Sequence, residues 1–194
     1  MKLVFATNNI HKIKEVQNLV SKEIEIVSLA DINCVEEIPE TGSTIESNAS
    51  EKAFYVYNKY GINCFADDTG LEIDALDGRP GVYSARYAGE SCNFENNITK
   101  VLSEMSGIEN RKACFRTVIS LIIAGKEIQF EGIVEGVILN ERHGDKGFGY
   151  DSVFKPNGYN ETFAEMPLEI KNSISHRYRA VQKLKEYLSL LKST

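Results

Sequence analysis

The sequence has no tryptophan and few cysteines among its 194 residues. Its four cysteines, Cys34, Cys64, Cys92 and Cys114, form no C-x-x-C pair, which disfavours a zinc site. Long hydrophobic runs are also missing. The apolar N-terminal run is too short for a signal peptide, and no stretch is long enough to span a membrane. We therefore expect a cytoplasmic protein with reduced thiols and no membrane partner.

Positive charge is scarce as well. Lysine and arginine number 22 against 28 aspartates and glutamates, which gives a net charge of -6. Proteins that bind nucleic acid polymers use clustered lysines and arginines, so we expect no such partner. A small anionic ligand needs only a few local cations and is compatible with this charge. The length and the 42% hydrophobic content predict a single domain over residues 1–194, in one body or two lobes, with a substantial core.

One acidic stretch carries the strongest chemical signal. Residues 64–66 suit a buried strand, and Asp67 and Asp68 follow at its expected exit, where Thr69 and Gly70 are expected to turn the chain. Adjacent carboxylates repel each other, and burial sharpens the conflict. A divalent metal, or a general base with a raised pKa, would relieve it. A solvated acidic turn explains the same residues without a ligand.

The N-terminal segment predicts a strand over residues 2–6, then a polar hexapeptide, Thr7–Lys12, and a helix. The helix follows from apolar residues at helical spacing: Ile13, Val16, Leu19 and Val20. A helix N-terminus favours an anion, and Lys12 adds a positive charge, so the hexapeptide is a candidate phosphate site. Ordinary capping of the helix by Asn or Thr is the alternative.

A second predicted helix begins near residue 43. Ser43 and Glu46 fit a capping box, and Asn48 and Lys52 lie one turn apart on one side of the helix. Glu40 stands on the loop just before this start. It is either a metal ligand or a solvated loop residue.

Two alternating stretches, residues 113–123 and 128–139, predict a long antiparallel hairpin. The later sequence GFGYDS lacks the third glycine of a dinucleotide fingerprint, and no helical pattern follows it. Glycines on both sides of an aromatic residue instead suggest a backbone that approaches a flat ligand, with Phe148 or Tyr150 available to stack. A glycine-rich hairpin corner is the alternative.

The last predicted helix places Lys171, His176 and Arg177 at its start, and Asn172, Ser173 or Ser175 can cap it. Cations at a helix N-terminus oppose the helix dipole, so a nearby anionic or carbonyl-bearing ligand would offset them. The apolar stripe of this helix consists of Ile174, Tyr178, Val181, Leu184, Leu188 and Leu191.

Together these parts suit a magnesium-dependent nucleotide hydrolase. The chain also resembles the inosine triphosphate pyrophosphatase (Ham1-like) family over nearly its whole length and in the right order. The motifs that carry this resemblance are Thr7-x-Asn9-x-x-Lys12, Glu40-Thr41-Gly42, Asn48-Ala49, Lys52-Ala53, residues 66–71 (ADDTGL), residues 80–86 (PGVYSAR), residues 147–151 (GFGYD) and Ser175-His176-Arg177.

The resemblance implies hydrolysis of non-canonical purine nucleoside triphosphates (ITP, dITP and XTP) to the monophosphate and pyrophosphate. It implies an α/β fold of two lobes, with a long central mixed β-sheet flanked by helices and the active-site cleft between the lobes. It also implies Mg²⁺ as cofactor and a homodimer.

Carried over by motif, Asp68, Lys12 and Lys52 would be catalytic, and Glu40 and Asp68 would bind Mg²⁺, with Asp67 and Glu72 around them. Asp68 would also activate the attacking water. The substrate-binding residues implied by the resemblance are Thr7, Asn8, Asn9, Ile10, His11, Lys12, Thr69, Phe148, Gly149, Tyr150, Asp151, Lys171, His176 and Arg177.

Three other functions fit parts of the sequence. An aspartyl phosphatase needs D-x-D, but Thr69 follows Asp68 directly, which disfavours it. A Maf-like pyrophosphatase for other modified nucleotides is a closer alternative. A nucleotide-binding regulator without turnover is the third, and the presence of Asp68, Glu40 and Lys12 together speaks against it.

Overall fold

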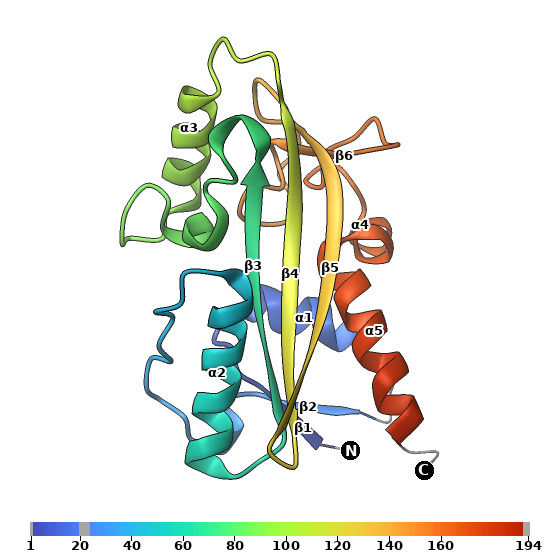
Figure 1. Cartoon of the computed structure of the whole chain (residues 1–194). Helices are drawn as coiled ribbons and strands as arrows, with labels where there is room; N and C mark the ends of the chain where they lie inside the picture. Colours follow the sequence, from blue (N-terminus) through green and yellow to red (C-terminus); the bar gives the residue numbers. More distant parts are fainter. Residues whose placement is uncertain (1, 20–23, 192–194) are drawn as a thin grey trace. The chain divides into compact units, whose positions relative to one another are not determined.

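The computed structural model describes residues 2–19 and 24–191, so Val20 of the first predicted helix lies outside the described residues. The chain folds into two compact units (Figure 1). The first unit comprises residues 1–68, 117–132 and 177–194, and the second comprises residues 69–116 and 133–176.

The fold is α/β, with a six-stranded sheet in the order β2-β1-β3-β4-β5-β6. Parallel pairing of β1 with β2 and β3, and antiparallel pairing of β5 with β6, make the sheet mixed, as predicted. The strands are β1 (Lys2–Phe5), β2 (Glu25–Val27), β3 (Cys64–Ile73), β4 (Lys112–Ile123), β5 (Lys126–Ile138) and β6 (Phe154–Pro156). The α-helices are α1 (Ile10–Leu19), α2 (Ile45–Tyr60), α3 (Phe94–Glu104), α4 (Leu168–Ile174) and α5 (His176–Leu191). Short 3-10 helices cover Ala30–Ile32, Asp74–Leu76 and Gly81–Arg86.

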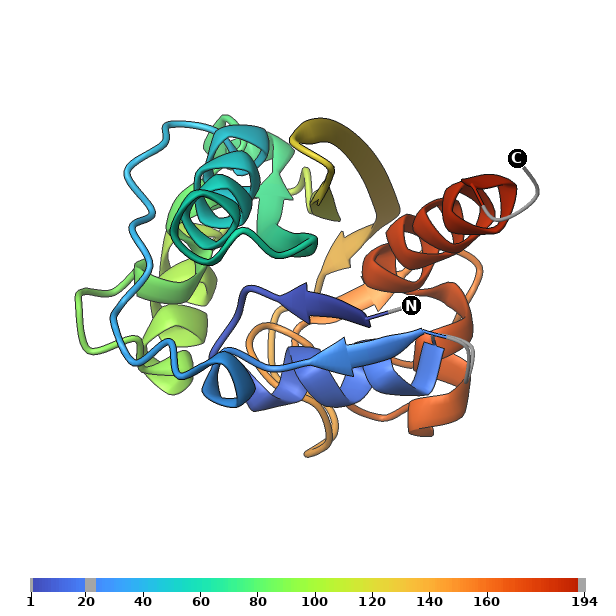
Figure 2. The same cartoon turned by 90° about the horizontal axis from the view of Figure 1, so that it is seen from below.

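In the first unit, strand alternation sends side chains to two separate cores. Leu3 and Phe5 of β1 and Phe65 of β3 pack with α1 and α5, and the rings of Phe5 and Phe65 stack 4.4 Å apart. The intervening residues Val4 and Ala6 pack on the opposite face, against α2. Figure 2 shows α1 running beside β1 and β2. Both faces of this part of the sheet are therefore covered by helices, which explains why its strands are apolar on both sides.

The second unit has its own core. Leu71 and Ile73 from the later part of β3 pack with Ile98 and Val101 of α3. Further members of this core come from β4, β5, β6 and the loop after β6: Phe115, Val134, Ile138, Phe154, Phe163 and Met166. The long strands thus contribute to the cores of both units, because the chain passes between the units within β3, β4 and β5.

Two local predictions are wrong. Thr69 and Gly70 do not turn the chain, since β3 continues to Ile73 and the side chains of Leu71 and Ile73 are buried. Asp and Gly are turn residues by preference, but burial of the apolar residues after them extends the strand.

The helix cap is the second error. The capping box of α2 is formed by Thr44 and Ser47, one residue later than the predicted pair of Ser43 and Glu46.

Other predictions are confirmed. β4 and β5 are neighbours joined by a two-residue turn in which Ala124 and Gly125 both have positive φ, 49° and 78°, as in a tight antiparallel hairpin. His176 and Arg177 lie in the first turn of the last helix, as predicted. Ile174, which was expected in its apolar stripe, and the cap candidates Asn172 and Ser173 belong instead to the separate helix α4. Among the described residues, no helix combines the length and apolar character that a membrane crossing needs.

Candidate active site

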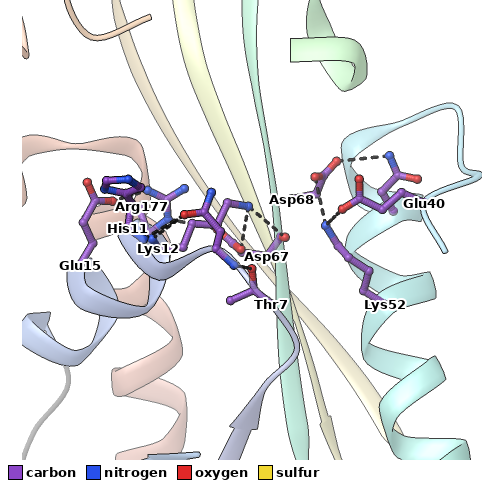
Figure 3. A network of polar contacts seen from close by, with 11 residues as sticks. Thr7, His11, Lys12, Glu15, Glu40, Lys52, Asp67, Asp68 and Arg177 are labelled. Atoms are coloured by element: carbon purple, nitrogen blue, oxygen red, sulfur yellow. Dashed lines mark hydrogen bonds and ion pairs between the residues drawn. The ribbon is translucent and has the colours of Figure 1, made fainter. Parts of the chain in front are cut away.

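Strand β3 sends its two neighbouring aspartates to opposite faces. Successive side chains of a strand alternate, so Asp67 continues the face of Phe65 and Asp68 continues the face of Ala66. Figure 3 shows their carboxylates on the two sides of the strand. The predicted repulsion between them is therefore relieved by geometry, and Asp67 lies on the opposite face from Asp68 rather than beside it, as was expected around the predicted metal ligands.

Asp67 is the centre of a buried cluster of charges. Its carboxylate accepts from Lys12 Nζ at 2.9 Å and from Arg177 Nε at 3.0 Å. Arg177 Nη1 also donates to the Glu15 carboxylate, and all three of Asp67, Glu15 and Arg177 are buried. Burial disfavours the charge of Asp67, but Lys12 and Arg177 outweigh it and hold the pKa of Asp67 well below its usual range. Burial also lowers the pKa of Lys12.

Asp68 lies in a second cluster, built with α2. Lys52 Nζ donates to Asp68 Oδ1 at 3.2 Å and also contacts the Glu40 carboxylate, while Asn48 Nδ2 donates to Asp68 Oδ2 at 3.3 Å. Lys52 and Asn48 lie one turn apart on α2, as predicted, and both are buried. Burial raises the pKa of Asp68 despite the attraction of Lys52. For Lys52, the carboxylates of Asp68 and Glu40 outweigh burial and raise its pKa.

The second cluster has the chemistry of a magnesium site. Glu40 and Asp68 supply carboxylate oxygens, and Asn48 Oδ1 is buried without a hydrogen-bond partner among the described residues. No group of three or more His, Cys, Asp or Glu residues gathers for a metal in residues 2–19 and 24–191. Mg²⁺ typically takes one or two protein carboxylates and completes its shell with water and substrate phosphates. The oxygen donors present here therefore fit that ion.

The predicted phosphate segment forms the start of α1. Asn9 Oδ1 accepts from the backbone N–H groups of His11 and Lys12, at 3.0 and 3.3 Å, so Asn9 caps the helix as the capping interpretation predicts. Thr7 Oγ1 accepts from the Asn9 N–H at 3.2 Å. Asn8 and Ile10 are exposed. Their role in phosphate binding stays a prediction.

The second unit brings together three of its predicted residues. Asp151 accepts from the Phe148 N–H and from Lys171 Nζ, both at 2.8 Å. The Lys171 ammonium lies 5.1 Å from the centre of the Phe148 ring, within cation–π range. Gly147 has φ +78°, and a Cβ there would lie 2.1 Å from Asp151 Oδ2, so only glycine leaves room for this carboxylate. The buried Lys171–Asp151 pair therefore fixes the Phe148 loop.

The remaining predicted residues of the second unit differ in accessibility. Tyr150 is not available to stack on a ligand, because it is buried and its hydroxyl donates to the Ser84 carbonyl at 2.8 Å. Phe148 is half-buried and is the one of the two aromatic residues that can do so. The His176 ring is buried and stacks on Phe115 with ring centres 4.8 Å apart. Thr69 lies half-buried in β3, and Gly149 has φ +60°, where an added Cβ would have nothing within 4 Å.

Several residues escaped the sequence reasoning. Glu15 is separated from Arg177 by 162 positions, and nothing in its helical context distinguishes it from a surface glutamate. Phe94, at the start of α3, lies 6.2 Å from Phe148 between ring centres and is 38% exposed. Glu72 was expected around the metal ligands, and the structure pairs it with Arg116 Nη2 at 2.9 Å, a partner that the sequence did not suggest.

Comparisons with known proteins agree on one family. The model of the Ham1 family matches residues 3–187. A dITP/XTP pyrophosphatase of Flavobacterium johnsoniae is 56% identical over 192 residues, covering 99% of this chain and 100% of that protein. One of Porphyromonas gingivalis is 53% identical, covering 96% and 97%. Among solved structures, a HAM1 protein from Coxiella burnetii has a TM-score of 0.91 at 36% identity and covers 97% of this chain and 98% of that one.

Proposed function

Because the chain belongs to the Ham1 family, we propose that it is a nucleoside triphosphate pyrophosphatase that hydrolyses dITP, XTP and ITP to the monophosphate and pyrophosphate. The observation that carries this proposal is the cluster in which Lys52 meets both Asp68 and Glu40. It combines a buried carboxylate of raised pKa, a cation and oxygen ligands for a metal, which are the groups that hydrolysis of a phosphoanhydride needs.

In the proposed reaction, the oxygen of a water attacks the α-phosphorus and its proton passes to the Asp68 carboxylate. The bond from the α-phosphorus to the bridging oxygen breaks, and pyrophosphate leaves. A raised pKa makes the ionised Asp68 carboxylate a stronger base toward the water proton. Lys52 faces the charge that develops on the phosphate oxygens, and Lys12 with the start of α1 binds the outer phosphates.

Glu40 and Asp68, with the Asn48 amide oxygen beside them, would hold Mg²⁺. Bound there, Mg²⁺ would neutralise phosphate charge and polarise the phosphoryl group.

We assign Phe148 to stack on the base, with the Lys171–Asp151 pair fixing its loop. Hypoxanthine and xanthine carry a keto oxygen where adenine carries an amino group. His176 and Arg177 remain our candidates to donate to that oxygen, and with ATP a donor would face a donor. Buried polar groups left unpaired discriminate strongly, so we expect ATP to be a poor substrate.

The test is a product assay with Mg²⁺ and each of ITP, dITP, XTP, GTP and ATP. We expect pyrophosphate and the nucleoside monophosphate from the first three and little turnover of ATP. Orthophosphate as the first product would refute a pyrophosphatase. Omission of Mg²⁺, with EDTA present, should abolish turnover, and Mn²⁺ should restore it.

We further propose a homodimer, on the strength of the resemblance, and a cytoplasmic location, on the strength of the sequence composition. Sedimentation equilibrium tests the first part, where a monomer at all concentrations would contradict it. Fractionation of cells that express the chain tests the second.

A further inference from the structure

The loop that carries Glu40 is held on α2 by a residue outside the motifs of the site. Both oxygens of the Glu51 carboxylate accept from Thr41: the backbone N–H donates at 2.7 Å and Oγ1 at 2.8 Å. These two bonds, the backbone bond first, lower the pKa of Glu51. Two donors on one ionised carboxylate form a stronger and more directional contact than a single neutral hydrogen bond.

The Glu51–Thr41 contact lies next to the Lys52–Glu40 contact on both the helix and the loop. Glu51 precedes Lys52 on α2, and Thr41 follows Glu40 in the loop. Lys52 contacts the Glu40 carboxylate while Glu51 binds Thr41. Two adjacent residues of α2 therefore bind two adjacent residues of the loop. Together these contacts fix the position and the orientation of the Glu40 side chain.

In a third contact, the same loop packs closely against the first turn of α2. A Cβ on Gly42 would lie 2.2 Å from Ser47 Oγ and 2.7 Å from Asn48 Oδ1. The backbone at Gly42 thus approaches the amide oxygen that we assign beside the metal. Glu40 and Thr41 are themselves exposed.

We infer that Glu51 is a positioning residue, which acts through Thr41 to hold Glu40 where it binds the divalent cation. The inference rests on the proposed function and extends it to a residue outside the family motifs. Outer contacts that orient a metal ligand raise affinity because the ligand need not be ordered when the ion binds.

The test measures Mn²⁺ binding to the nucleotide-free full chain by titration calorimetry, for Glu51→Ala and Thr41→Val. Glu51→Ala removes both bonds and should weaken Mn²⁺ binding by roughly tenfold to a hundredfold. Thr41→Val removes only the bond from Oγ1 and should weaken Mn²⁺ binding measurably, by a smaller factor. Both variants should raise the Mg²⁺ concentration for half-maximal turnover of ITP, with kcat at saturating Mg²⁺ near that of the wild type. Thr41→Ser keeps both donors and should behave as the wild type.

Glu36→Gln is the matched control. It also removes a carboxylate that pairs with α2, through Lys59, but it has no bond to Thr41, so Mn²⁺ affinity should not change. Thr41→Val leaves every charge in place, so weaker Mn²⁺ binding in this variant cannot result from lost attraction between the cation and Glu51. It would show that the position of the loop matters. If Glu51→Ala does not fold, Thr41→Val still tests the inference.

Wild-type Mn²⁺ affinity in both Glu51→Ala and Thr41→Val would overturn this inference and leave the proposed function standing. Weaker Mn²⁺ binding in Glu51→Ala but not in Thr41→Val would have the same consequence. A lowered melting temperature without a change in Mn²⁺ affinity would show a structural role only and would also overturn it. If the folded wild type binds no Mn²⁺, the proposed metal site fails and this inference fails with it.

Discussion

Asp67 and Asp68 are adjacent in β3, yet each carboxylate pairs with a different lysine on a different face of the strand. Asp67 lies 2.9 Å from Lys12 Nζ, and Asp68 lies 3.2 Å from Lys52 Nζ. The two environments move the pKa values apart, below the usual range for Asp67 and above it for Asp68. Two titratable groups whose environments separate their pKa values commonly have different roles, and we propose a structural charge for Asp67 and a base for Asp68.

Asp68→Asn should abolish turnover and leave the fold intact. Asparagine keeps the size of the side chain but cannot accept a proton from water, and loss of a general base costs roughly a hundredfold to ten-thousandfold in kcat. Because burial already disfavours the Asp68 charge, we expect an unchanged or slightly higher melting temperature. Pyrophosphate release and thermal unfolding measure the two effects. Turnover at the wild-type rate would remove Asp68 from the role of base.

Asp67→Asn should act on stability instead. It leaves Lys12 and Arg177 buried without their shared carboxylate, and breaking a buried ion pair costs about 3 kcal/mol or more. Urea unfolding of the variant measures this cost. Asp145→Asn, on an exposed loop, removes the same charge and should cost almost nothing. Equal stability of the two variants would contradict the structural role of Asp67.

The low pKa of Asp67 also predicts an acid dependence of stability. In the unfolded chain an aspartate titrates near pH ~4, whereas in the folded protein Asp67 keeps its charge to lower pH. Its contribution is complete above that pH and is lost as the pH falls toward the folded pKa. The free energy of unfolding should therefore fall more steeply in acid for the wild type than for Asp67→Asn. Parallel pH profiles would argue against the charged cluster.

Gly147→Ala should weaken nucleotide binding through Asp151. A Cβ at residue 147 would collide with Asp151 Oδ2, which must then move away from Lys171. Loss of one charge-assisted hydrogen bond, about 1.5–3 kcal/mol, corresponds to a rise in KM of roughly tenfold to a hundredfold. Steady-state kinetics with ITP measure it.

Gly158→Ala is the control for backbone strain. Gly158 has φ +84°, close to the +78° of Gly147, but a Cβ added to Gly158 would have nothing within 4 Å. Both variants should lose similar stability from the left-handed backbone, about 1–2 kcal/mol, and only Gly147→Ala should raise KM. A similar KM in both would mean that Asp151 does not support the base site.

The sequence predicted the apolar elements well and the polar contacts less well. Alternation and helical spacing located β4, β5 and α5, because burial of apolar faces depends on local periodicity. The continuation of β3 past Asp67 and Asp68 was missed, since the cations that allow two aspartates inside a strand come from α1, α2 and the start of α5. Such long-range charge pairs leave no periodic signal in the sequence.

Lys52→Gln should make the melting temperature more dependent on Mg²⁺. In the wild type the Lys52 ammonium neutralises both Glu40 and Asp68, so a divalent cation must compete with it. Glutamine leaves the two carboxylates facing each other, and an ion that binds only the folded state then stabilises it more the more tightly it binds. We expect a lower melting temperature without metal and a larger rise on Mg²⁺ addition than in the wild type. Lys59→Gln removes an exposed cation on the same helix as Lys52, where it pairs with Glu36 of the preceding loop, and should show the wild-type response. If Mg²⁺ raised the melting temperature of Lys52→Gln and of the wild type equally, the lysine and the metal would not share these carboxylates.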